Sequence, residues 1–331
     1  MTEMDEACAS AMAAVTSINR QLSTWLIDAA LPVWDEHGVD RCGGGYYETL
    51  LYDESTRCFE ARGTLRRGRV VARQIYVFGV GEARGWRSAR SSPLAHGCEH
   101  LFSRFYLGDG VFHTAIDART GEPGSPFSLY EQSFYLFALA RVTAAFGQRY
   151  PVAESALRCL QRLRGRFANE RGGFYETDPP ELPLKSNPHM HLLEAALEWV
   201  ENTDGHLQRA WIALAQEIVG LCLTHFRDAR SGAVREYFDF QWQAIPGDDG
   251  RIVEPGHQFE WAWLLLRWAA SPHCEAGEAV VCREAAARLI ELAEEHGVDA
   301  NRGVAINEIW DDMTAKDQTA KLWPQTERLK A

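Results

Sequence analysis

The sequence predicts an all-α fold: an (α/α)6 toroid of helical hairpins with short β-turn or hairpin insertions, lacking its last helix pair. Three observations predict it. A glycine-led turn motif recurs along the chain, helical patterns fill the intervals in pairs, and 46% of the 331 residues are hydrophobic, enough for one large core. We therefore expect residues 1–331 to form a single (α/α)6-barrel domain.

The turn motif joins glycine to a short alternating or aromatic segment, a pattern typical of a small hairpin. With Gly45, Gly110, Gly173, Gly232 and Gly303 as anchors, successive copies are 65, 63, 59 and 71 residues apart. Self-similarity at a nearly fixed period indicates a repeated architecture. The copies read Gly44-Gly45-Tyr46-Tyr47-Glu48, Gly110-Val111-Phe112-His113-Thr114, Gly172-Gly173-Phe174-Tyr175-Glu176, Gly232-Ala233-Val234-Arg235-Glu236 and Gly303-Val304-Ala305-Ile306-Asn307-Glu308.

Between the motifs, apolar residues recur at i, i+3, i+4 and i+7, which predicts ten helices, two per copy. Six pairs would need twelve helices, so we expect the domain to be truncated at its C-terminus, with apolar faces of the first and tenth helices exposed. A complete or open five-pair array is the alternative. The expected helices are Met4–Ala29, Leu65–Ala83, Pro93–Tyr106, Ser128–Phe146, Val152–Phe167, Pro188–Val200, Leu207–Phe226, Gln258–Ala270, Ala276–His296 and Lys316–Leu329.

Composition excludes several classes of protein. A net charge of −12 argues against a nucleic-acid or anionic-membrane partner. The acidic N-terminus does not resemble a signal peptide, and no stretch of about 18 apolar residues predicts a membrane span. The eight cysteines form no CxxC pair, which favours reduced thiols over a zinc ribbon. We expect a cytoplasmic protein, and a homodimer is compatible with the sequence.

Candidate site residues lie where inner helices begin, because those ends face the centre of a toroid. In Asn187-Pro188-His189-Met190-His191, Asn187 can cap a helix and Pro188 can take its first position. The two histidines diverge by about 200° on a helix, so only one can line the cleft directly. His191 and Glu194 share a face at i, i+3. The alternative is a hydrogen-bonded histidine of the inner wall.

A second segment, Glu254-Pro255-Gly256-His257-Gln258-Phe259-Glu260-Trp261, repeats this pattern. His257 and Glu260 stand at i, i+3, so the carboxylate is expected to orient an imidazole that shuttles protons near pH 7. A structural His–Glu pair is one alternative and a metal site is another. Both pairs have the order His-x-x-Glu and neither matches HExxH, so we expect no metal and no cofactor.

Weaker signals come from three other helices. Trp323, Gln325 and Glu327 combine an apolar ring with groups that hydrogen-bond hydroxyls. Arg73 stands in an apolar helix, where a buried guanidinium would need a carboxylate or substrate oxygen beside it. Tyr130 begins another inner helix.

Four segments together resemble the N-acylglucosamine 2-epimerase superfamily, and most of all its bacterial mannose isomerase (aldose–ketose isomerase) branch. The resemblance runs along essentially the whole chain. The segments are Val71-Ala72-Arg73-Gln74-Ile75-Tyr76, Asn187-Pro188-His189-Met190-His191, Glu254-Pro255-Gly256-His257-Gln258-Phe259-Glu260-Trp261 and Leu322-Trp323-Pro324-Gln325-Thr326-Glu327.

The resemblance implies a cofactor-free sugar isomerase. It makes His257 the first catalytic acid/base, oriented by Glu260, and His191 a pocket histidine that assists ring opening or binding. Arg73 would bind the oxygens near C1 and C2 and stabilise an enediol. Sugar contacts would come from Tyr130, Asn187, Trp323 and Glu327. The family's second catalytic histidine follows the segment that ends at Glu327, in a helix that this sequence does not include.

The function expected is therefore interconversion of a free aldose and ketose, D-mannose and D-fructose in type, through a cis-enediolate. Epimerisation at C2, as between N-acetylglucosamine and N-acetylmannosamine, is the first alternative. A glycoside hydrolase is less favoured because it needs two flanking carboxylates, whereas these helix starts offer histidines. A sugar- or protein-binding barrel without chemistry is the third possibility. The expected partner is a monosaccharide substrate.

Overall fold

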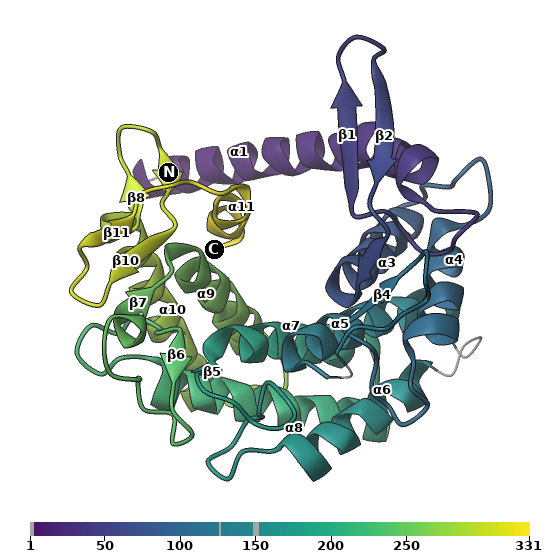
Figure 1. The fold of residues 1–331 in the computed structure, drawn as a ribbon. Helices are drawn as coiled ribbons and strands as arrows, with labels where there is room; N and C mark the ends of the chain where they lie inside the picture. Colours follow the sequence, from purple (N-terminus) through teal and green to yellow (C-terminus); the bar gives the residue numbers. More distant parts are fainter. Residues whose placement is uncertain (1–2, 126, 148–151) are drawn as a thin grey trace.

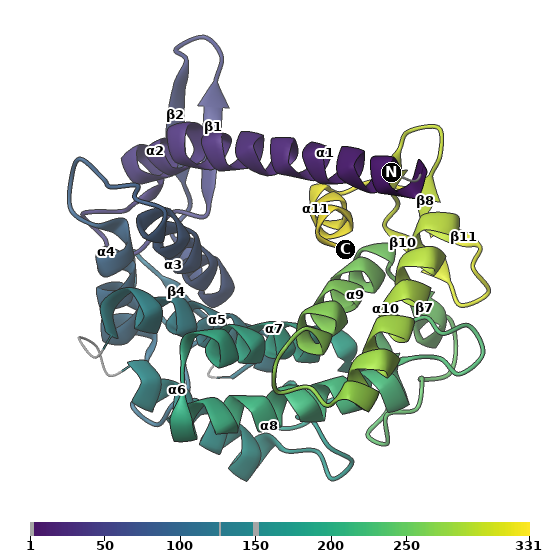
Figure 2. The ribbon, with the colours of Figure 1, turned by 180° about the vertical axis from the view of Figure 1, so that it is seen from behind.

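A computed structural model describes residues 3–125, 127–147 and 152–331, and helices dominate this part of the chain. Five inner helices lie side by side around the centre of a ring, and outer helices cover them (Figures 1 and 2). The inner helices are α3 (Gly68–Ala83), α5 (Leu129–Phe146), α7 (Ser186–Asn202), α9 (Pro255–Ala269) and α11 (Leu322–Lys330). The outer helices are α1 (Glu3–Trp25), α4 (Pro93–His100), α6 (Val152–Arg162), α8 (Gly205–Leu221) and α10 (Ala276–His296).

Most outer helices end in a π-helical turn, which completes the longer helices that the sequence predicts. These turns are η3 (Leu101–Phe105), η5 (Leu163–Phe167) and η6 (Cys222–Phe226). Helix α1 continues through η1 (Leu26–Ala30), α2 (Leu31–Val33) and η2 (Trp34–Gly38). The expected all-α ring of paired helices is confirmed.

The inner helices bury far more than one face. In α7, thirteen of its seventeen residues are buried, among them Trp199, which is fully enclosed and stacks on Trp211 of α8. A helix that is apolar nearly all round belongs in an interior, and the outer helix α6 instead alternates polar and buried positions. This difference in patterning places α5, α7 and α9 inside the ring.

All five copies of the turn motif form the small hairpins that the sequence predicts. Each follows an outer helix and folds back on the residues that end it, through the bridges Val39–Tyr46, Tyr106–Phe112, Ala168–Phe174 and Arg227–Val234 and the pair of strands β8 (Val298–Asp299) and β9 (Val304–Ala305). Glycine is required at the turn: Gly173 has φ +70°, and a Cβ there would lie 2.8 Å from His189 Nε2.

In four of the five inner helices, one side chain ties the helix to a turn motif. Gln132 accepts from the backbone N–H of Phe112 at 3.0 Å and donates to its carbonyl at 2.8 Å. Gln258 makes the same pair of bonds with Val234, and Gln325 makes them with Ala305. In α7 the position is held by His189. This recurring bond, the turn-tying contact, fixes the start of each of these helices.

Short strands come just before three of the inner helices, α3, α7 and α9. β3 (Leu65–Arg67) pairs with β4 (Ala115–Asp117), and β5 (Leu184–Lys185) pairs with β6 (Tyr237–Phe238). β7 (Ile252–Val253), β10 (Glu308–Trp310) and β11 (Ala315–Asp317) form a three-stranded sheet. A separate hairpin, β1 (Thr49–Asp53) with β2 (Cys58–Arg62), projects from the ring (Figure 1).

Two expected helix starts are wrong. The chain is a strand over Leu65–Arg67, and helix α3 begins only at Gly68. The last helix begins at Leu322 and not at Lys316, which lies in β11. In both places the backbone pairs with a neighbouring strand, and that tertiary pairing overrides a helical pattern of side chains.

Helix α1 runs along the side of the ring between α11 and α3 (Figure 2) and carries an exposed apolar row. The row consists of Met12, Val15, Ile18, Leu22 and Trp25, each 44–62% exposed. Exposure of apolar residues on the first helix is what the sequence predicts. Among the described residues, no helix has the length and apolarity that crossing a membrane requires.

Candidate functional site

A cavity of about 420 Å³ opens at the centre of the ring, and every inner helix contributes to it. Its lining includes all eight residues singled out by the sequence: Arg73, Tyr130, Asn187, His191, His257, Glu260, Trp323 and Glu327. It also includes Phe134, Phe137, Glu194, Glu254 and Lys330. Residues up to 257 positions apart thus meet because successive inner helices present their N-terminal turns or their adjoining faces to one space.

His257 is buried near the N-terminus of α9, and its imidazole contacts two carboxylates. Nδ1 lies 3.0 Å from Glu236 Oε2 and 3.7 Å from Glu254 Oε2. Nε2 lies 3.2 Å from Asn187 Nδ2. Burial lowers the pKa of His257, but Glu236 and Glu254 outweigh burial and raise it to about 10. At neutral pH this histidine is therefore an imidazolium held between carboxylates.

The expected orientation of His257 by Glu260 is wrong. A side chain at the start of a helix points back towards the N-terminus, so His257 reaches the residues that precede α9, and Glu260 lies one turn further along. Glu260 instead approaches His191, with Oε1 3.5 Å from Nδ1.

His191 belongs to a second cluster, deeper along the inner helices. Its Nδ1 is 3.3 Å from Glu194 Oε2, and burial lowers its pKa. Burial, assisted by Glu327 and Glu194, raises the pKa of Glu260 to about 8. Lys330 forms an ion pair with Glu327. At neutral pH His191 is therefore a neutral imidazole beside a carboxyl group that holds its proton.

His189, the neighbour of His191 in sequence, makes the turn-tying contact. Its Nε2 accepts from the backbone N–H of Phe174 at 3.0 Å, and its Nδ1 donates to the Lys185 carbonyl at 3.0 Å. Burial lowers the pKa of His189 to about 4, so it stays neutral. Of the two histidines in this segment, the cavity receives His191 alone.

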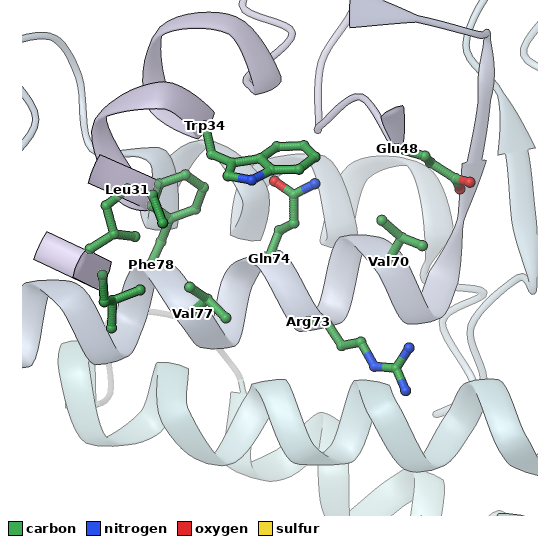
Figure 3. Close-up of a pocket in the computed structure, with 10 residues that line it drawn as sticks. Leu31, Trp34, Glu48, Val70, Arg73, Gln74, Val77 and Phe78 are labelled. Atoms are coloured by element: carbon green, nitrogen blue, oxygen red, sulfur yellow. The ribbon is translucent and has the colours of Figure 1, made fainter. Parts of the chain in front are cut away.

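Arg73 is not buried, contrary to the expectation from its apolar helix. Figure 3 shows its guanidinium on the opposite side of α3 from Gln74 and Trp34. The group lies 4.1 Å from the centroid of the Phe134 ring, and no ion pair of Arg73 is found among the described residues. Arg73 therefore offers the cavity a charge that is not already neutralised.

A smaller cavity of about 260 Å³ lies against α3 beside Trp34 and Gln74, and Arg73 belongs to its lining as well (Figure 3). Leu26, Leu31, Val77 and Phe78 give it a mainly apolar wall. A sugar carries a hydroxyl on nearly every carbon and needs matching polar groups, so the central cavity is the better candidate for a sugar site.

Among the described residues, two groups of three come close enough to surround a cation: His191 with Glu194 and Glu260, and His257 with Glu236 and Glu254. In each group the imidazole Nδ1 already faces a carboxylate oxygen within hydrogen-bond distance. We interpret both as hydrogen-bonded acid–base clusters, and the absence of a metal requirement stays a prediction.

Glu236 was not predicted to be a site residue. It is the fifth residue of its turn motif, and Glu48 and Glu176 occupy the same place in two other copies. Recurrence of glutamate at one motif position was the available signal. Lys330 and Glu254, which also line the cavity, were not predicted either.

Comparisons with known proteins agree with this architecture. The sequence profile of the N-acylglucosamine 2-epimerase (GlcNAc 2-epimerase) family matches residues 9–331. A protein of Rhizobium meliloti (strain 1021) named mannose-6-phosphate isomerase is 43% identical over 318 residues, which cover 94% of this chain and 78% of that protein.

Solved structures share the fold at lower identity. A D-mannose isomerase gives a TM-score of 0.79 at 20% identity, covering 93% of this chain and 79% of the other. Cellobiose 2-epimerase from Spirochaeta thermophila DSM 6192 gives a TM-score of 0.76 at 21% identity, covering 95% and 78%. The chain is a sugar epimerase or isomerase and belongs to the N-acylglucosamine 2-epimerase family.

Proposed function

We propose that the chain is an aldose–ketose isomerase that interconverts a free aldose and ketose of the D-mannose/D-fructose type. The observation that carries the proposal is the meeting of two imidazoles, His257 and His191, with the unpaired Arg73 in one central cavity. Nearby carboxylates raise the pKa of His257, whereas burial lowers the pKa of His191. Groups whose environments push their pKa values apart are suited to acid and base roles.

The reaction follows from these groups. After ring opening, a base removes the C2 proton of the open-chain aldose, and the electron pair moves through the forming C1–C2 double bond onto the carbonyl oxygen. Arg73 stabilises the cis-enediolate oxygens electrostatically. The proton of the C2 hydroxyl passes to the oxygen on C1, a proton enters at carbon C1 as the carbonyl forms at C2, and a ketose results. We assign the proton transfers to His191 and His257, with Glu260 supporting His191.

Contacts to the sugar complete the proposal. Trp323 presents an indole to C–H groups, and Tyr130, Asn187 and Glu327 offer polar atoms to hydroxyls. Epimerisation at C2 uses the same enediolate and differs only in where the proton returns, so 2-epimerase activity is the second candidate.

A free sugar fits the cavity better than a phosphorylated one. Its cations are Arg73, Lys330 and, at neutral pH, His257. Lys330 is paired with Glu327 and His257 with Glu236, which leaves Arg73 as the cation without a carboxylate partner among the described residues. A phosphate dianion would therefore meet one unpaired cation here, although the Rhizobium relative is named for a phosphorylated sugar.

The test is incubation of the protein in D₂O with D-mannose, D-mannose 6-phosphate and N-acetylglucosamine, followed by NMR. The proposal expects fructose from mannose, with deuterium entering at the carbon that receives the proton. Dialysis against EDTA should leave turnover unchanged. Turnover of the phosphorylated sugar alone would contradict the choice of a free sugar, and epimer without ketose or binding without turnover would contradict the isomerase reaction. A cytoplasmic location and a homodimer remain predictions.

A further inference from the structure

We propose that Glu236 is a positioning residue for His257: it accepts the Nδ1 proton of the imidazole and so keeps Nε2 facing the sugar cavity. The inference rests on the proposed function for its catalytic consequence. Its geometry stands independently, on one hydrogen bond of 3.0 Å between buried groups, each at most 4% exposed.

Glu236 is held in place from several directions. Ser186 donates its hydroxyl to Glu236 Oε2 at 3.3 Å, and the Ser186 backbone N–H donates to the Glu236 carbonyl at 3.2 Å. Two residues earlier, Val234 is fixed by both bonds of the turn-tying contact from Gln258. Since Gln258 directly follows His257, the same turn motif holds both the helix and the carboxylate that meets its histidine.

The second imidazole nitrogen faces the cavity. Nε2 is 3.2 Å from Asn187 Nδ2, and the ring centroids of His257 and Trp323 are 5.0 Å apart. Both neighbours line the cavity. Asn187 Oδ1 is buried without a hydrogen-bond partner. Because an amide offers donors on one side and an acceptor on the other, a half-turn lets Asn187 face either the neutral or the protonated imidazole.

Other carboxylates around His257 are less suited to this task. Glu254 lies on the N-terminal side of α9, but its nearest oxygen is 3.7 Å from Nδ1, beyond a good hydrogen bond. Glu260 is on the next turn and approaches His191 of α7 instead. Glu254 and Glu260 raise the pKa of His257 by their charge, whereas Glu236 is the only carboxylate among the described residues within hydrogen-bond distance of Nδ1.

Comparison with other copies of the turn motif shows what is special about the fourth. Glu48, in the first copy, binds the backbone N–H and guanidinium of Arg67. Glu176, in the third, pairs with Lys185 Nζ at 3.2 Å. In those copies the carboxylate meets a cation near an inner-helix start. In the fourth copy the same position meets a histidine that lines the cavity.

The experiment compares Glu236→Gln with Glu176→Gln, which removes the carboxylate at the equivalent position of another copy. Two measurements are made on each: the ¹⁵N shifts of the His257 ring, assigned by their absence in His257→Gln, and kcat and KM for the sugar that the wild type converts. For Glu236→Gln we expect altered Nδ1 and Nε2 shifts, kcat lower by about 10²-fold and KM nearly unchanged. Glu176→Gln should match the wild type in all three.

The outcomes separate the two proposals. If the wild type converts no sugar, the proposed function fails, while the ¹⁵N shifts still decide whether Glu236 sets the state of His257. If the wild type is active and Glu236→Gln has the wild-type ¹⁵N shifts of His257 and the wild-type kcat, the positioning role of Glu236 is overturned. Ser186→Ala provides a second variant should Glu236→Gln fail to fold. It removes the serine hydroxyl that donates a hydrogen bond to Glu236 and keeps the charge of Glu236. Ser186→Ala should change the ¹⁵N shifts of His257 and lower kcat in the same direction as Glu236→Gln, but by less. Wild-type shifts and kcat in Ser186→Ala would contradict the positioning role of Glu236.

Discussion

Replacing Glu260 with glutamine should make the protein more stable at alkaline pH and less active. Glu260 is 4% exposed, and burial, Glu327 and Glu194 raise its pKa to about 8. In the unfolded chain the same group titrates near about 4.3. Folding therefore favours the protonated carboxyl, and its stabilisation is complete below the unfolded pKa and is lost as pH rises through the folded pKa.

The magnitude follows from that difference. Each pH unit between the two pKa values lowers the free energy of unfolding by about 1.4 kcal/mol. Glu260 therefore lowers it by up to about 5 kcal/mol between the unfolded pKa and pH 8. Glutamine has nearly the same shape and cannot ionise. The free energies of unfolding of wild type and Glu260→Gln should therefore lie close together at pH 5, and the variant should gain a few kcal/mol by pH 8.5.

Urea unfolding followed by circular dichroism at pH 5, 7 and 8.5 measures this difference. Glu284→Gln is the control, because Glu284 is exposed on the outer helix α10. Glu236 and Glu254, which both proteins retain, are the main causes of the raised pKa of His257, so the stability that this histidine loses at high pH largely cancels in the comparison. Curves for wild type and Glu260→Gln that remain parallel across the pH range would show that the carboxylate is ionised and solvated. Turnover should fall in the variant because His191 loses its neighbouring acid.

The remaining predictions concern the charge and the histidines of the cavity. Arg73→Ala should lower kcat by about 10²–10³-fold, as expected for loss of an oxyanion-stabilising group, and leave the far-UV circular dichroism unchanged; a small effect on kcat would place the enediolate elsewhere. His189→Gln should keep both the melting temperature and turnover, since glutamine makes the turn-tying contact in three other inner helices. His191→Gln should fold and lose about 10²-fold or more of kcat; equal activity of the two histidine variants would refute this division of roles.

The fold could be predicted because its signals are local. The hairpins repeat a short glycine pattern, and the helical period is visible within each segment, so α10 was predicted to the residue. The two wrong helix starts, at Leu65 and Lys316, lie where the backbone pairs with a distant strand. Such pairing depends on where the ring brings segments together, and a helical pattern in one segment does not contain that information.

The same limit explains the error at His257. Spacing of i, i+3 identifies neighbours on one helix, and it led to Glu260. The partner that the structure shows is Glu236, 21 positions earlier, from a loop whose approach depends on the turn-tying contact of Gln258. The prediction that Arg73 is buried was wrong for a related reason. An apolar stretch predicts a buried helix, but it does not show that this position faces an open cavity.

The inner-helix starts serve the fold and the site with adjacent residues. In α5, α7 and α11, the residue two positions before the turn-tying side chain lines the cavity: Tyr130, Asn187 and Trp323. In α9 that place is Gly256, where a Cβ would lie 2.4 Å from the Trp323 ring. The missing side chain lets the indole lie against α9, 5.0 Å from the imidazole of His257. Because α9 has no side chain at Gly256, the indole of Trp323 can lie against His257. In the reaction we propose, His257 transfers a proton beside this aromatic wall of the cavity.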